Sequence, residues 1–197
     1  MNQSIDWAFG LLWCAVSATA IFVGGFVAIY AGFFLGGLVG HAVQSTNEGI
    51  AGYVVFWTLV PLILSAAVGV AQGWLLKDRL PTAQWFGATL GGGVIAAAII
   101  VGIGFNDASV GANAASLAVW LGTAFTQWWL LKSFSARAIV WLVVPILLMA
   151  GTVQIPIALG QPNSMISQPP IIILVYGIVT AILIVWILQT AQTRSME

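Results

Sequence analysis

The chain has 197 residues, of which 61% are hydrophobic and only 5% are charged, and its five basic residues balance its five acidic ones. Soluble domains carry roughly a quarter charged residues, so this composition excludes an ordinary soluble fold. Zero net charge also argues against nucleic-acid binding, because such proteins neutralise phosphates with lysine and arginine. The sequence therefore predicts an all-α integral membrane protein whose surroundings are the lipid bilayer.

Six stretches are long and apolar enough to cross a bilayer as helices, which takes about 20 residues because each backbone group must be hydrogen-bonded within its own segment. Polar, glycine or proline residues separate them, and no charged linker divides the chain, so we expect one polytopic membrane domain over residues 1–197. The first apolar pattern runs on to Gly40, which leaves open a longer helix or a turn along the membrane surface. The predicted spans lie near residues 7–31, 50–76, 82–105, 112–131, 138–159 and 170–189.

Small residues recur every four positions along the first predicted span and its continuation. Residues at this spacing share one face of a helix, and small side chains there let two helix backbones approach closely. We expect this stripe to be a packing surface, either against the protein's own helices or against a partner. Its candidate interface residues are Gly24, Ala28, Gly32, Gly36 and Gly40.

His41 is the only histidine, and it follows this stripe. One imidazole cannot form a zinc site without further ligands, and Cys14, the only cysteine, is expected to be a packing residue. The commoner role of such a histidine is capping or hydrogen bonding, and the alternative is an axial ligand to a pigment magnesium or a haem iron. The sequence requires no cofactor and predicts no metal site.

The second and fourth predicted helices end in a shared pattern of glutamine, any residue, tryptophan, two leucines and lysine, starting at Gln72 and Gln127. A weaker third copy has Ile184 in place of the glutamine. The spacing of about 55 residues fits two spans with their turns, so the pattern predicts three repeated helical hairpins, whose natural packing is around an approximate threefold axis. Chance is the rival explanation, because tryptophan, leucine and lysine are common at cytoplasmic helix ends.

The repeated Gln-X-Trp-Leu-Leu-Lys ends, each followed by a helix with tryptophan near its start, resemble a group of uncharacterised small multipass membrane proteins of cyanobacteria and Chloroflexota. The likeness covers the second to sixth predicted helices, most clearly residues 69–85 and 122–141, and Ile184 departs from it. The resemblance implies no activity. It does imply the plasma or thylakoid membrane of a phototroph.

Gln72 and Gln127 are the candidate site residues, because each lies about one turn inside the predicted membrane boundary, where an amide needs partners. Interhelical hydrogen bonding is the expected role, and the alternative is a pair of amides that orient a ligand at the mouth of a cavity. No acidic or basic residue falls near the centre of a predicted span. This argues against ion coupling, proton relay and acid–base catalysis, so we expect no enzyme.

All five lysines and arginines fall on one predicted side of the membrane, whereas the opposite connections contain only Glu48 and Asp107 as charges. Positive residues concentrate in cytoplasmic loops, so both termini are expected in the cytoplasm. Seven tryptophans near this side are interpreted as an aromatic belt at the level of the lipid headgroups. They are Trp7, Trp74, Trp85, Trp128, Trp129, Trp141 and Trp186.

These patterns predict a non-catalytic membrane subunit that helps assemble or stabilise a larger complex, with other membrane subunits or a second copy as partners. One alternative is a small binder or transporter of a hydrophobic or neutral solute, since the chain resembles such proteins in size and number of spans. The other is a pigment-associated subunit of a photosynthetic complex, which the resemblance and His41 bring into consideration.

Overall fold

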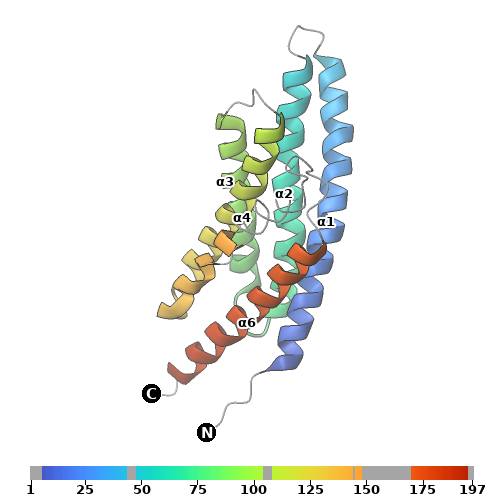
Figure 1. The fold of residues 1–197 in the computed structure, drawn as a ribbon. Coiled ribbons are helices and arrows are strands. Elements are labelled where there is room, and N and C mark those ends of the chain that lie inside the picture. Colours follow the sequence, from blue (N-terminus) through green and yellow to red (C-terminus); the bar gives the residue numbers. More distant parts are fainter. Residues whose placement is uncertain (1–5, 44–47, 104–107, 144, 148–169, 195–197) are drawn as a thin grey trace.

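The structure is a computed structural model that describes residues 6–43, 48–103, 108–143, 145–147 and 170–194 (Figure 1). Over these residues the regular structure is entirely helical, as predicted. Three of the helices, α1 to α3, are long and apolar enough to cross a membrane. The elements are α1 (Trp7–Ala42), α2 (Glu48–Leu76), α3 (Thr82–Ile103), α4 (Ala108–Leu131), η1 (Ala136–Leu142) and α6 (Pro170–Arg194).

Helix α1 is longer than the predicted span 7–31, because it continues as one helix of 36 residues. Asp6 caps its start by accepting a hydrogen bond from the Phe9 backbone N–H at 3.0 Å. No proline or charged residue follows until the helix has ended, so nothing stops it at the expected boundary. At about 1.5 Å per residue α1 measures about 54 Å, well above the roughly 30 Å of a bilayer's hydrocarbon core.

The fifth predicted span, 138–159, differs from the expectation at its start. Residues 136–142 form a 3₁₀-helix instead of an α-helix. Ser135 caps its start by accepting from the Arg137 N–H at 3.3 Å, and residues 143 and 145–147 are α-helical again. Residues 148–169, which hold the rest of this span and the expected connection 160–169, lie outside the described residues.

Helices α1 and α2 form a long antiparallel hairpin, α3 and α4 pack beside α2, and α6 crosses the lower half of α1 (Figure 1). The start of α1, the turn between α2 and α3, and the ends of α4 and α6 lie at the same end of the bundle. At the opposite end the α1–α2 hairpin projects beyond α3 and α4. The first end holds Lys77, Arg79, Lys132 and Arg137, and we call it the basic end.

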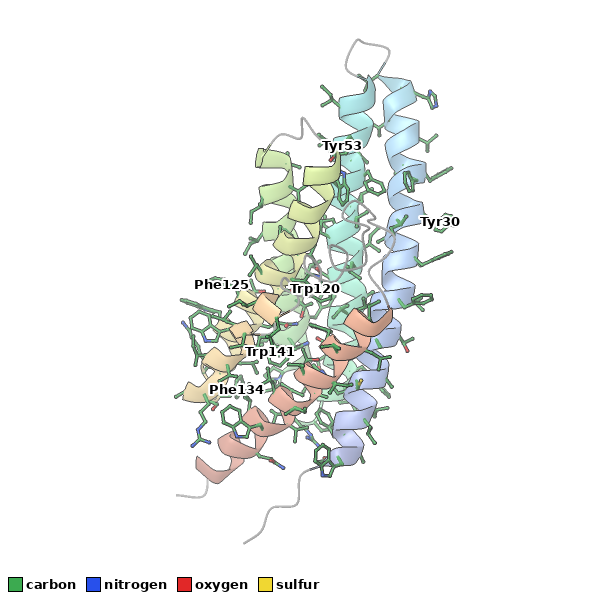
Figure 2. All side chains as sticks on the ribbon, in the orientation of Figure 1. Tyr30, Tyr53, Trp120, Phe125, Phe134 and Trp141 are labelled. Atoms are coloured by element: carbon green, nitrogen blue, oxygen red, sulfur yellow. The ribbon has the colours of Figure 1, made fainter. Side chains whose placement is uncertain are left out.

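The upper half of α1 packs on α2 and presents a row of large apolar side chains outward. Figure 2 shows Tyr30 pointing away from the bundle, and it is 61% exposed. A face of this kind is stable only against lipid or another apolar surface. We call it the aromatic ridge, and it comprises Phe22, Phe26, Tyr30, Phe33 and Phe34.

Candidate functional site

Two glutamines from different helices meet in the interior near the basic end. Gln72 lies near the end of α2 and Gln127 near the end of α4, and their side chains are 0% and 2% exposed. The Gln127 Nε2 atom donates to the Gln72 Oε1 atom over 3.4 Å. The structure thus brings both sequence-predicted residues into one buried polar contact.

Each glutamine carbonyl also accepts a hydrogen bond from a buried indole on the element that follows it in the chain. Trp85 of α3 donates from Nε1 to Gln72 Oε1 at 3.3 Å. Trp141 of η1 donates in the same way to Gln127 Oε1 at 3.1 Å. These bonds join α2 to α3 and α4 to η1, and we call each contact between an indole N–H and its acceptor a tryptophan junction.

The amide nitrogens are satisfied by hydroxyl groups on the element that precedes each glutamine. Gln72 Nε2 donates to Ser17 Oγ of α1 at 3.0 Å, and Gln127 Nε2 donates to Thr89 Oγ1 of α3 at 2.9 Å. Thr89 lies four residues after Trp85, one helical turn along the same face. Buried polar groups therefore meet partners within the protein, as a solvent-free interior requires.

A third tryptophan junction joins the first described helix to the last. Trp13 of α1 donates from Nε1 to Thr180 Oγ1 of α6 at 3.1 Å. Ile184, which stands in place of the glutamine in the third copy of the pattern, is fully buried one turn further along α6. Trp13 lies four residues before Ser17, as Trp85 lies four before Thr89. The third junction therefore uses a threonine hydroxyl where the other two use a glutamine carbonyl.

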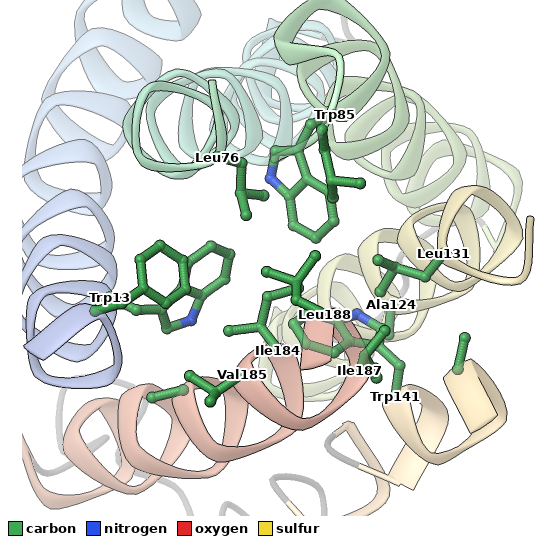
Figure 3. Close-up of a cluster of buried hydrophobic side chains, with 14 residues drawn as sticks. Trp13, Leu76, Trp85, Ala124, Leu131, Trp141, Ile184, Val185, Ile187 and Leu188 are labelled. Atoms are coloured by element: carbon green, nitrogen blue, oxygen red, sulfur yellow. The ribbon is translucent and has the colours of Figure 1, made fainter. Parts of the chain in front are cut away.

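The three junction tryptophans stack edge to face at the centre of the largest apolar cluster (Figure 3). Ring centroids are 5.9 Å apart for Trp13 and Trp85, and 6.0 Å apart for Trp85 and Trp141, at interplanar angles of 75° and 79°. Such pairs contribute about 0.5–1.5 kcal/mol beyond their apolar area. Ile184 lies in the same cluster. The interior at this end is therefore well packed, with the polar groups enclosed in an apolar shell.

The aromatic-belt interpretation is wrong for two of its seven members. Trp85 and Trp141 are 0% and 1% exposed, and both belong to the junctions. Trp7, Trp74 and Trp129 are well exposed, and they lie at the start of α1 and near the ends of α2 and α4, as a belt requires. A tryptophan close to a basic helix end has the same local sequence whether it faces lipid or the core, so the pattern alone did not separate the two cases.

The small-residue stripe of α1 faces α2. A Cβ atom at Gly36 would lie 2.6 Å from the Gly52 carbonyl oxygen, and one at Gly24 would lie 2.6 Å from the Ala67 Cβ. At these positions the two helices approach too closely for any larger side chain. Gly24, Ala28, Gly32 and Gly36 are buried, whereas Gly40 is half-buried. The structure therefore places the stripe in a contact between the protein's own helices.

His41 is exposed at the end of α1. It borders an open groove of about 450 Å³ between α1 and α2, whose other lining residues include Gly40, Tyr53 and Phe56. In the described part of the chain, no group of three or more histidine, cysteine or acidic side chains could hold a metal ion.

Charged groups at the basic end pair with each other and with aromatic rings. Arg79 forms an ion pair with Asp6 and also lies over the Phe9 ring at 3.9 Å from its centroid. The hydrogen bond from Arg79, with that from the Phe9 N–H, holds the pKa of the Asp6 carboxyl below its usual value. This pair ties the start of α1 to the turn between α2 and α3.

The amide network offers hydrogen bonds but neither charge nor space. None of the six residues that form the amide network, namely Ser17, Gln72, Trp85, Thr89, Gln127 and Trp141, is acidic or basic, so the network itself has no group for general acid–base chemistry. A cavity of about 10 Å³ adjoins Gln127 and Trp141, which is room for about one water molecule. Comparison with protein family models, with characterised proteins and with solved structures finds no match.

Proposed function

We propose that this protein is a non-catalytic integral membrane subunit that stabilises a larger membrane complex through its outer surface. The observation that carries the proposal is that the two buried glutamines spend their amide groups on bonds within the protein. Gln72 and Gln127 bond to each other, to two indoles and to two hydroxyls. The adjoining cavity is too small for a solute. We therefore assign the function to the outward-facing surfaces of the protein.

The aromatic ridge of α1 is the surface best suited to hold a partner. Phe33 and Phe34 are each 67% exposed, and Phe26 is 59% exposed. Aromatic side chains are large and rigid, so they give much contact area at little cost in conformational entropy. The partner is a transmembrane helix of another subunit, because a ridge within the α1 span meets only partners that share the bilayer.

The topology that supports this role has six spans, with both termini in the cytoplasm. Helices α4 and α6 have 24 and 25 residues, enough to cross a bilayer. Positive residues gather at the basic end, which the positive-inside rule assigns to the cytoplasm. The resemblance to membrane proteins of cyanobacteria and Chloroflexota favours a plasma or thylakoid membrane.

An internal repeat of three hairpins is part of the same proposal. It is supported by matching contacts, since Gln72 relates to Ser17 and Trp85 as Gln127 relates to Thr89 and Trp141. In both cases the hydroxyl precedes the glutamine in the chain and the indole follows it. Two helix ends can share a short sequence motif by chance. It is less easy for chance to give both motifs the same kinds of hydrogen-bond partner in the same order along the chain.

A binder of an apolar solute is the alternative, and two open grooves favour it. One of about 480 Å³ runs between α1 and α2 past Thr19, Gly24 and Ala67. The other is the groove beside His41, where a pigment could also gain an axial ligand. Both are shallow and open along their length, so lipid chains compete directly for them.

Purification in a mild detergent, followed by native mass spectrometry, tests the proposal. We expect protein partners in fixed ratio, and we expect them to be lost from a Phe26→Ala, Phe34→Ala variant. Phe125→Ala is the matched control, because Phe125 is an exposed aromatic residue on α4 outside the ridge. A solitary chain with one small molecule bound would favour the alternative. Partner loss in the control variant as well would remove the ridge from the argument.

A further inference from the structure

We propose that one tightly bound water molecule links the second and third tryptophan junctions, held in the small cavity between α4 and α6. The cavity measures about 10 Å³. That volume corresponds to one water molecule and to nothing larger. Lining residues are Trp120, Thr123, Ala124, Gln127, Trp141, Pro145, Tyr176 and Thr180.

The cavity lies beside the second junction, that of Trp141 with Gln127, and it also borders Thr180 of the third. One turn after Trp13 and one turn after Trp85 a hydroxyl, of Ser17 or Thr89, accepts from a glutamine amide. One turn after Trp141 the chain has Pro145, which offers no side-chain hydrogen bond, and the glutamine position holds Ile184. An amide–hydroxyl pair is therefore replaced by two apolar side chains, and Pro145 lines the remaining space.

Acceptors for a water molecule are present on both sides of the cavity. The Gln127 carbonyl oxygen can accept two hydrogen bonds and receives one from Trp141. The Thr180 hydroxyl donates to the Tyr176 carbonyl and receives one bond from Trp13, so one lone pair remains. Thr123 donates within its own helix to Val119 and keeps its lone pairs for the cavity. A water proton therefore finds acceptors on both α4 and α6.

The Tyr176 hydroxyl supplies the donor that the water oxygen needs. Tyr176 lines the cavity, and its phenol hydroxyl carries a proton that it can donate to a water oxygen there. One accepted and two donated bonds give the three that a buried water usually makes.

Other occupants fit less well. None of the described residues that line the cavity is charged, so these residues would not compensate an ion for its lost hydration. An apolar occupant would leave the lone pairs of Gln127 and Thr180 unpaired in a low-dielectric interior. A water molecule satisfies both groups and links α4 to α6 between the second and third junctions.

An experimental structure at a resolution that reveals ordered water is the direct test. We expect a density peak within hydrogen-bond distance, about 2.6–3.2 Å, of Gln127 Oε1 and of Thr180 or Thr123 Oγ1. In an Ala124→Ser variant the new hydroxyl occupies the cavity, and we expect the peak to vanish while the melting temperature is kept. A cavity without density, in a map that shows other buried waters, would overturn the proposal. A cavity closed by a shifted side chain would do the same.

A stability measurement gives a second readout. Thr123→Val keeps the shape of the side chain and removes an acceptor for the water, and we expect a melting temperature about 2–4 °C lower, as for one lost hydrogen bond in a chain of this size. Thr126→Val is the matched control, because Thr126 also donates to carbonyls of α4 but does not line the cavity. Equal melting temperatures for the two variants would contradict the water site.

Discussion

Replacing Gln127 by leucine tests whether the amide network holds the bundle together. Leucine has a similar volume and no polar atom, so packing is largely kept. Three side-chain hydrogen bonds disappear, those with Thr89, Gln72 and Trp141. The buried Trp141 indole also loses its acceptor. The change therefore isolates the polar contribution of one residue.

The expected loss follows from these contacts. Interhelical side-chain bonds in membranes average about 0.6 kcal/mol, so three contribute about 2 kcal/mol. A stranded buried donor costs a further 1–3 kcal/mol or so, and the total lies at roughly 3–5 kcal/mol. Gln72→Leu removes a comparable set of bonds, to Ser17, Trp85 and Gln127, and should cost a comparable amount.

Unfolding in mixed micelles, followed by tryptophan fluorescence, measures this loss, because the junction tryptophans lie inside the network. Gln84→Leu is the matched control, since Gln84 is an exposed glutamine on α3. The double variant of Gln72 and Gln127 should lose less than the two single losses combined, because the amides bond each other. A Gln127→Leu loss within about 0.5 kcal/mol of the control would refute the reasoning.

Three further predictions concern the helix contact, the charged end and the orientation. Gly36→Leu should destabilise the fold strongly, because its Cβ atom would lie 2.6 Å from the Gly52 carbonyl oxygen. Gly37→Leu should be nearly neutral, because nothing lies within 4 Å of a Cβ atom at that position. Thermal unfolding of both variants measures the difference. The pKa of Asp6 is lowered in the fold, so its pair with Arg79 stabilises above the usual pKa of 3.8, and this contribution should disappear as the pH falls below that value. An Asp6→Asn variant should lack this part of the acid dependence in pH-titrated unfolding. Reporter fusions should place both chain ends in the cytoplasm, and a signal from the other side at either end would contradict the six-span topology.

Helix boundaries could be predicted from the sequence wherever the chain marks them with polar or breaking residues. The turn from Lys77 to Pro81 is such a place, and α2 and α3 end and begin there as expected. The first helix lacks any such mark before His41, so its length depends on packing against α2, which composition does not reveal. The 3₁₀ geometry of residues 136–142 depends on local capping by Ser135, which hydropathy does not detect.

The two glutamines could be singled out because an amide inside a membrane span is conspicuous. Their partners could not, because serine, threonine and tryptophan are ordinary residues in such spans. One signal was available: Trp13 with Ser17 and Trp85 with Thr89 share a four-residue spacing, which places indole and hydroxyl on one helix face. Thr180 takes the acceptor role that a glutamine has at the other two junctions. It lies four residues before Ile184, which occupies the glutamine position of the repeat, so aligning the copies does not identify it.

The bond from Trp13 to Thr180 also sets an order of assembly. Its two residues are 167 positions apart, and at roughly 5–20 residues per second a ribosome needs on the order of 10–30 s to make the intervening chain. Until then the first helix stands in the membrane with its indole N–H unsatisfied by α6. The nascent protein therefore exposes a polar edge on α1 throughout synthesis, which is the period in which an insertion chaperone or a neighbouring subunit can bind it. Closure of the bundle by this bond therefore has to wait until α6 has been made.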